Sequence, residues 1–520
     1  MAVRGPFAHG AGRDVTGRRD VIANYLGSAW VALVNIAFVP LYVRYLGVEA
    51  YGLIGLFASF QTWLTLLDGG LTPTLSRELA LAESGVRAPQ SVRDLVVTAE
   101  MTFAAIIALI ATSFLFLAPW LVDHWIRTKD LGPREVVHAF QAMGFLLGIR
   151  WLASLYRGAY VGLQRQVWFN SWSSVFATLR GVGTIAALAY LSRSVVTFFI
   201  VQSIISAVES LFLAISVRRF LPHAQRSGRF RIESVAGVWR FAAGMTILAL
   251  LGLLLTQVDK LLLSKLLPLS AFGSYMVANS IAAGLYLLVA PITNVSYPRF
   301  VSQVASCDQR RLAEIYHRFA QATAVMVMPA GIVLALFANR ALTLWTGSAE
   351  IGQKAAIFVS LLALGNMLHG LMHTSYTLQL AYGWTRFNII VNAVAVVLLL
   401  PALYFGIRTY GAVAAAFLWA VLNLAYVVIA TPLVHRQLLR SEMVRWYRQS
   451  VLLPGVCAGA AASAVWILTR SEPLRVTQNV TILCIALACA FLAAAFATPL
   501  GRKEIRSHCK LGRTLVARLR

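Results

Sequence analysis

Three arginines in otherwise apolar sequence are the residues best suited to bind a charged ligand. Arg150 and Arg157 lie in one apolar segment, and Arg180 lies in the next. An arginine at the centre of a membrane helix costs about 2.5–3.5 kcal/mol on insertion scales. A guanidinium group forms bidentate, charge-assisted hydrogen bonds to phosphate. We therefore expect these arginines to contact an anionic group within the membrane. An internal ion pair with Asp68 or Glu209 is the alternative.

Other polar side chains recur at helical spacing within apolar segments. We expect them to line a cavity or to take part in ion coupling, because polar groups inside membranes mark such sites. These residues are Asn35, Gln61, Asp68, Asp259, Asn366, His369 and His373. The uncharged residues among them could instead form hydrogen bonds that hold neighbouring helices together. Asp68 could instead pair with an arginine, and Asp259 could be a charge at the outer interface.

His369 and His373 have the i, i+4 spacing of a zinc-binding pair, but no carboxylate lies near them in the sequence. A proton relay or a polar lining is therefore favoured over a metal ion. The five cysteines also lack metal-ligand spacing. The sequence predicts no metal site.

The composition predicts the elements that hold these residues. The chain has 520 residues, of which 59% are hydrophobic and only 12% charged, whereas soluble proteins carry about 25% charged residues. No polar stretch is long enough for a soluble catalytic domain. Residues 1–20 are basic and lack an apolar core, so we expect no cleaved signal peptide. The net charge of +25 fits basic loops on one membrane side better than nucleic-acid binding.

Windows of about 20 apolar residues predict an all-α polytopic membrane protein with about 14 transmembrane helices. The expected bounds are 21–44, 51–75, 95–118, 137–162, 167–192, 195–217, 236–259, 271–296, 315–341, 353–381, 385–405, 411–432, 450–470 and 476–499. Lys and Arg concentrate in every second loop, which predicts that both termini are cytoplasmic.

An internal repeat suggests how the helices are organised. "RYLGVEAYGLIGLFAS" at 44–59 and "KLLPLSAFGSYMVANS" at 265–280 share a basic-Leu-Ala-aromatic-Gly register, 221 residues apart. We expect two pseudo-symmetric six-helix lobes in a parallel repeat, plus two extra C-terminal helices. Such lobes rock to give alternating access to a site near the midplane. The expected domains are a basic N-terminus at 1–20, lobes at 21–217 and 236–435, a linker at 218–235, helices 13 and 14 at 450–499, and a basic tail at 500–520.

Four segments resemble the polysaccharide-biosynthesis flippases of the multidrug/oligosaccharidyl-lipid/polysaccharide exporter superfamily. They are "YVRYLGVEAYGLIGLF" (42–57), "LLDGGLTPTLSRELA" (66–80), "GLQRQVWFNSWSSVFATLR" (162–180) and "DKLLLSKLLPLSAFGSYMVAN" (259–279). The resemblance covers about residues 20–435 and leaves helices 13 and 14 outside it. The family's motifs fall on Asp68, Gly70, Arg77, Gln164, Arg165, Asn170, Arg180, Asp259, Gly273 and Tyr275.

The resemblance implies a multi-pass protein of the bacterial inner membrane. It would flip undecaprenyl-pyrophosphate-linked oligosaccharide repeat units to the periplasmic leaflet for O-antigen, capsule or exopolysaccharide export. A proton or sodium gradient would drive it, without a bound cofactor. The arginines would then contact the pyrophosphate. The expected partners are the lipid-linked oligosaccharide and membrane lipid, with a polysaccharide polymerase and a chain-length regulator as further candidates, and no nucleic acid.

Two other functions stay open. A cation-coupled multidrug exporter of the same superfamily often carries an acidic residue in helix 1, where this chain has Asn24 and Asn35. A membrane polymerase or glycosyltransferase of the same pathway needs a sizeable outer loop or a loop acid for its chemistry. The longest expected outer loop, at 119–136, is short. The sequence therefore favours a transporter over an enzyme.

Overall fold

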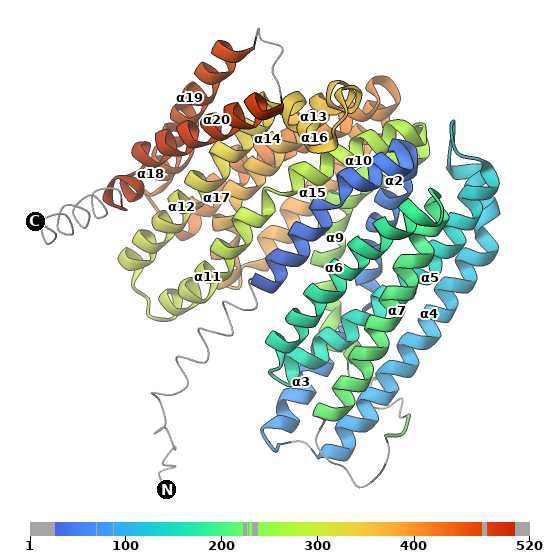
Figure 1. Cartoon of the computed structure of the whole chain (residues 1–520). Coiled ribbons are helices and arrows are strands. Elements are labelled where there is room, and N and C mark those ends of the chain that lie inside the picture. Colours follow the sequence, from blue (N-terminus) through green and yellow to red (C-terminus); the bar gives the residue numbers. More distant parts are fainter. Residues whose placement is uncertain are drawn as a thin grey trace, which may run out of the picture. The chain divides into compact units, whose positions relative to one another are not determined.

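The computed structural model describes residues 26–504, apart from 69, 87, 222–225, 227, 231–237 and 471–475. For 238–246 only the backbone is described. The described residues form helices and their connections, with no strand among them (Figure 1). The predicted all-α membrane fold is confirmed. The predicted basic N-terminus and most of the basic tail lie outside the described residues.

The chain divides into two compact units, Met1–Leu253 and Leu254–Arg520. This division falls within α9 (Val238–Leu266). The lobe boundaries expected from the sequence, at 217 and 236, stay a prediction, because the structure describes little of the linker between them. Each unit is considered by itself below.

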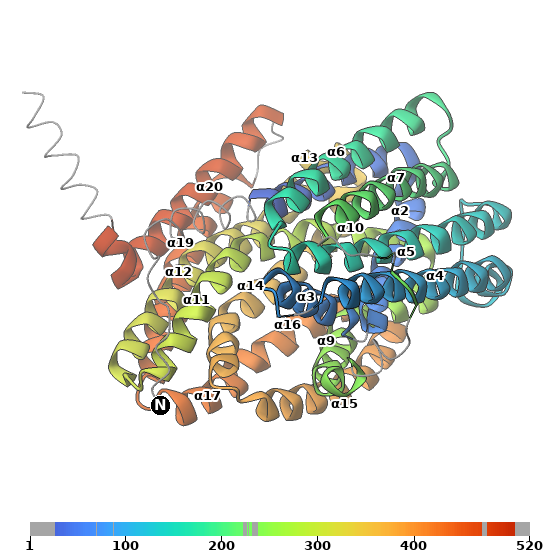
Figure 2. The same cartoon turned by 90° about the horizontal axis from the view of Figure 1, so that it is seen from below.

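The described part of unit 1 begins with a short apolar helix, Leu26–Ala37. The elements that follow are α2 (Val39–Leu64), a 3-10 turn (Thr65–Asp68), α3 (Leu71–Glu83), α4 (Pro89–Trp125), α5 (Pro133–Gly162), α6 (Gln166–Tyr190) and α7 (Val195–Phe220). Helix α5 packs against α4 and α7, and the three lie side by side in both views (Figures 1 and 2). Their core includes Phe103 stacked on Trp151, with ring centroids 4.1 Å apart.

Unit 2 contains the remaining elements. They are α10 (Leu269–Ala283), α11 (Tyr286–Ala305), α12 (Gln309–Leu336), α13 (Ala338–Thr346), α14 (Ala349–Ala381), α15 (Thr385–Tyr410), α16 (Ala412–Ala425), a π-helical turn (Tyr426–Ala430), α17 (Thr431–Leu438), α18 (Met443–Trp446), a second π-helical turn (Tyr447–Leu452), α19 (Leu453–Thr469) and α20 (Val476–Ala497). The last two correspond to predicted helices 13 and 14. They pack on α12 through small buried side chains, such as Ala458 and Ala490.

Eleven described helices are long and apolar enough to cross a membrane, or twelve when the bent pair α10 and α11 counts as one span. Two further predicted spans are helical in the structure. Predicted helices 1 and 2 share α2, which Gly47 interrupts with φ +85°, a conformation that glycine adopts without strain. Predicted helix 5 is α6, whose first half is rich in Ser and Asn and whose second half holds Arg180. The predicted count of 14 is therefore compatible with the structure.

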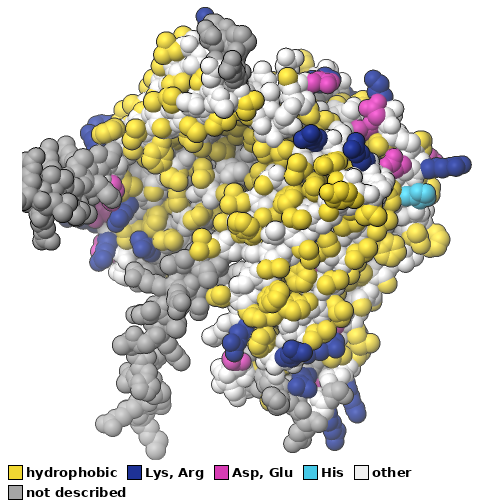
Figure 3. Space-filling model, viewed as in Figure 1, with side chains coloured by type: hydrophobic (Ala, Val, Ile, Leu, Met, Phe, Trp, Pro, Cys, Tyr) yellow, Lys and Arg dark blue, Asp and Glu magenta, His cyan; other side chains and the backbone are white. Residues whose placement is uncertain are grey.

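Apolar side chains are exposed along the flanks of these helices, as expected for surfaces in contact with lipid. In Figure 3 hydrophobic side chains cover the helix flanks, whereas Lys and Arg gather near helix ends. The large exposed apolar residues include Phe116 on α4, Val397 on α15 and Leu468 on α19.

The internal repeat is visible in the positions of the helix breaks. The break at Gly47 in unit 1 corresponds to that at Pro268 in unit 2, 221 residues later, as in the sequence alignment. Later in the chain, the α5–α6 and α14–α15 turns have the same hydrogen bonds. Arg165 N donates to Tyr160 O in one turn, and Trp384 N donates to Gln379 O in the other.

Candidate functional site

Arg150 lies at the centre of a polar cluster in unit 1. The continuous helix α5 positions this half-buried side chain, whose Nη2 donates to Oε1 of Gln202 on α7 at 2.9 Å. Its guanidinium carbon lies 5.5 Å from the ring centroid of Phe57 on α2. It also interacts electrostatically with Arg180 and Glu209. The structure therefore brings together two of the three arginines that the sequence analysis singled out.

Arg180 forms an ion pair with Glu209 between α6 and α7. Their side chains are only 13% and 9% exposed. This pair is one of the two internal pairs left open by the sequence. It leaves the cluster with one positive charge, because Arg150 is bonded to the neutral amide of Gln202. A second hydrogen bond, from Gln202 Nε2 to Thr184 Oγ1 at 3.2 Å, holds that amide in place.

Arg157 lies two turns further along α5 and is exposed. Glu100 on α4 accepts a hydrogen bond from the neighbouring residue Tyr156 at 3.2 Å and forms an ion pair with Arg218 at 2.9 Å. Arg157 forms no ion pair with a described residue, and its predicted contact with substrate stays a prediction.

The predicted polar residues of the first two helices differ in exposure and in hydrogen bonding. Asp68 is half-buried, and its Oδ1 accepts hydrogen bonds from Thr72 N and Thr72 Oγ1, at 3.2 and 2.6 Å. The first of these bonds satisfies a backbone N–H in the first turn of α3, whose N-cap residue is Gly70, and Asp68 forms no ion pair with a described residue. Gln61 is half-buried, and Asn35 is exposed.

In unit 2, Asp259 belongs to a buried charged group. Its carboxylate lies 3.2 Å from Nζ of Lys260 and accepts a hydrogen bond from the Tyr275 hydroxyl at 2.7 Å. Lys260, only 9% exposed, also donates to Thr256 O at 2.6 Å. The sequence analysis missed Lys260, although a cation beside an acid within an apolar segment was a visible signal.

Asn366, His369 and His373 share one face of α14. Asn366 Oδ1 accepts hydrogen bonds from Tyr286 and Trp419, at 3.0 and 2.8 Å, and its Nδ2 donates to a backbone oxygen at 3.0 Å. The ring of His369 lies 5.5 Å from that of His373. Asn366 thus joins α10, α11, α14 and α16, whereas the imidazoles retain hydrogen-bonding capacity.

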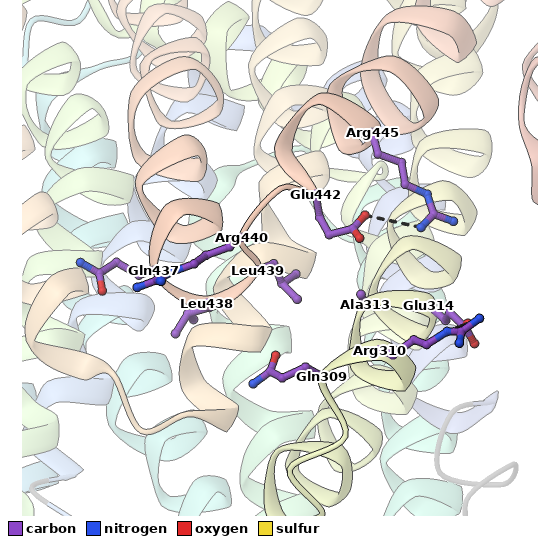
Figure 4. A pocket seen from close by; sticks show the side chains of 10 residues that line it. All are labelled: Gln309, Arg310, Ala313, Glu314, Gln437, Leu438, Leu439, Arg440, Glu442 and Arg445. Atoms are coloured by element: carbon purple, nitrogen blue, oxygen red, sulfur yellow. Dashed lines mark hydrogen bonds and ion pairs between the residues drawn. The ribbon is translucent and has the colours of Figure 1, made fainter.

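A polar pocket of about 710 Å³ lies where the start of α12 meets the α17–α18 turn (Figure 4). Its lining includes Arg310, Arg440 and Arg445. Glu442 bonds to Nε2 of the buried His317 at 2.7 Å and to Arg445 at 3.4 Å. In Figure 4 the three arginines point in different directions. The sequence analysis did not predict this pocket, whose polar residues belong to helix ends rather than to apolar segments.

Among the described residues, no three His, Cys, Asp or Glu side chains lie close enough together to hold a metal ion. Four cysteines lie in the described part of the chain, and all four are free thiols. Cys509 lies outside it. The described residues thus offer polar and cationic side chains rather than metal ligands.

Solved structures define the class of fold. The lipid II flippase MurJ in an inward closed conformation matches with a TM-score of 0.72 at 11% identity, over 91% of this chain and 98% of that one. An inward-facing multidrug resistance MATE family transporter of the MOP superfamily matches with a TM-score of 0.62 at 14% identity, over 80% and 96%. The chain therefore has the fold of these helical membrane transporters.

The family follows from the sequence comparisons. Residues 18–304, more than half of the chain, match the family described as "Polysaccharide biosynthesis protein". A putative O-antigen transporter of Shigella flexneri is 18% identical over 406 residues, which are 78% of this chain and 94% of the relative. This chain belongs to the polysaccharide biosynthesis protein family, as the sequence motifs indicated.

Proposed function

We propose that this protein flips undecaprenyl-pyrophosphate-linked oligosaccharides from the cytoplasmic to the periplasmic leaflet of the bacterial inner membrane. Its family membership and its transporter fold support transport of a lipid-linked polysaccharide precursor. The proposal goes beyond this support in specifying a pyrophosphate, a polyprenyl chain and the direction of transport. O-antigen, capsule and exopolysaccharide pathways would all supply such a substrate.

The single observation that carries the proposal is the unbalanced charge around Arg150. Arg180 is neutralised by Glu209, whereas Arg150 is held by an amide and an aromatic ring. Arg150 and Arg180 share the single carboxylate of Glu209, so a bound anion would balance the remaining positive charge, and pyrophosphate offers oxygens for bidentate bonding. A cavity for cationic drugs would gain nothing from this charge.

The proposal also covers the transport mechanism, its energy source and the protein partners. Transport proceeds by alternating access and is driven by a proton or sodium gradient, with both termini in the cytoplasm. The protein acts as a transporter rather than as a polymerase or glycosyltransferase, in keeping with relatives named for transport. A polysaccharide polymerase and a chain-length regulator are the expected protein partners.

A leaflet assay tests the proposal. Purified protein is reconstituted into vesicles with lipid-linked oligosaccharide extracted from host cells that lack this gene, and a membrane-impermeant enzyme or lectin reports the lipid exposed outside. We expect protein-dependent flipping that responds to an imposed proton or sodium gradient. Vesicles that flip no lipid-linked oligosaccharide but export a cationic dye would instead support the drug-exporter function.

A further inference from the structure

Helix α5 of unit 1 and helix α14 of unit 2 carry different side chains at equivalent positions. Helix α5 ends at Gly162 and α14 ends at Ala381, 219 residues later, and the turns after them have matching hydrogen bonds. Both helices are uninterrupted over their last turns. Counting back by the same offset aligns Arg150 with His369.

The same offset aligns the rest of this helix face. Ser154 aligns with His373, and Arg157 aligns with Tyr376. The side chain that contacts this face from the neighbouring helix also differs between the units. Gln202, which bonds to Arg150, lies seven residues after the start of α7. Trp419, which lies against His369, is seven residues after the start of α16. This face of α5 in unit 1 therefore carries two permanent positive charges. The equivalent face of α14 in unit 2 carries aromatic and imidazole rings and no permanent charge.

The rings of unit 2 form a continuous row. Ring centroids are 5.5 Å apart for His369 and His373, and 5.8 Å apart for His373 and Tyr376. Trp419 lies 5.8 Å from His369 on one side, and Tyr286 lies 5.5 Å from it on another. All five side chains are half-buried, so parts of them remain accessible.

The imidazoles of His369 and His373 and the hydroxyl of Tyr376 form no hydrogen bond to a described residue, whereas Tyr286 and Trp419 donate to Asn366. Nδ1 of His369 is also buried, and it has no partner among the described residues. By contrast, Asn366 on the same helix face uses both its amide oxygen and its amide nitrogen in hydrogen bonds. A polar group left without a partner in an apolar environment is costly. These groups are therefore suited to bond a ligand.

We propose that His369, His373, Tyr376 and Trp419 form a sugar-binding surface for the glycan of the transported lipid. Aromatic faces pack against the C–H faces of sugar rings, and the unused imidazole and phenol groups bond sugar hydroxyls. A phosphate would require the permanent cations that unit 1 has and this face lacks. The proposal rests on the proposed function, because it concerns the sugars of the same substrate.

A competition experiment tests this proposal. Flipping of the extracted lipid-linked oligosaccharide is measured in vesicles against increasing free oligosaccharide, released from the same lipid by mild acid. The variants His373→Phe and Tyr376→Phe keep ring volume and remove the hydrogen-bonding groups. Met372→Leu, on the same helix next to His373, is the matched control. Thermal unfolding in detergent checks that each variant folds.

We expect the free oligosaccharide to inhibit the wild-type protein and the control at equal concentration. Each Phe variant should need about three- to tenfold more, as for one neutral hydrogen bond lost. Inhibition that is absent in the wild type, or equal in all variants, would overturn the sugar-binding surface while leaving flipping itself established. A wild-type protein that flips no lipid-linked oligosaccharide would instead refute the proposed function.

Discussion

Charge removal at Arg150 and at Arg180 should have different consequences, because only Arg180 has a carboxylate partner. In the variant Arg150→Gln the substrate loses one charge-assisted hydrogen bond, which is worth about 1.5–3 kcal/mol. At 1.4 kcal/mol per factor of ten, flipping falls about 10- to 150-fold. The amount of folded protein should stay unchanged, because the partner that remains, Gln202, is neutral.

The variant Arg180→Gln should instead fail at folding. It leaves Glu209, whose side chain is 9% exposed, without its counter-ion. Breaking a buried ion pair by removing one partner costs about 3–5 kcal/mol. We expect low abundance in the membrane and a lowered unfolding temperature. The double variant Arg180→Gln, Glu209→Gln should recover most of the loss, because two neutral amides replace the ion pair.

Two measurements separate these outcomes. Flipping in vesicles is normalised to the amount of reconstituted protein, and thermal unfolding is measured on the same preparations. Arg310→Gln serves as the control, since it removes an arginine whose side chain is 93% exposed. Wild-type flipping by Arg150→Gln would refute the phosphate contact. Wild-type stability of Arg180→Gln would refute the reasoning about the buried pair.

Three further predictions concern stability and coupling. Gln164, at φ +54°, is an exposed non-glycine residue in the left-handed region, so Gln164→Gly should raise the free energy of unfolding by up to about 1 kcal/mol in denaturant titration. Lys260→Met should destabilise unit 2 by about 3–5 kcal/mol, and adding Asp259→Asn should restore its unfolding temperature; no rescue would contradict a buried ion pair. Asp68→Ala should cost about 0.5–2 kcal/mol through loss of the cap on Thr72, with unchanged pH and sodium dependence of flipping; an altered dependence would instead assign Asp68 to ion coupling.

The fold was largely readable from the sequence for a simple physical reason. A helix in lipid must bond all its backbone groups internally and present apolar side chains, so each span is visible as an apolar run. The repeat was readable because both copies keep a basic-Leu-Ala-aromatic-Gly register around the same helix break, at Gly47 and Pro268. The span count was less certain where a helix is polar, as α6 is around Arg180.

The sequence by itself determined that this is a helical membrane transporter with arginines placed where lipid would not tolerate them alone. Only the tertiary structure decided which arginine is neutralised. Arg180 and Glu209 lie on different helices, and spacing within one helix cannot tell which side chains of two packed helices meet. The same holds for Arg150 and Gln202, and for the ring row on α14, whose equivalence to the arginine face became clear from matching helix ends. Helix packing, and not periodicity, therefore decides that Arg180 is paired with a carboxylate and that Arg150 is bonded to a neutral amide.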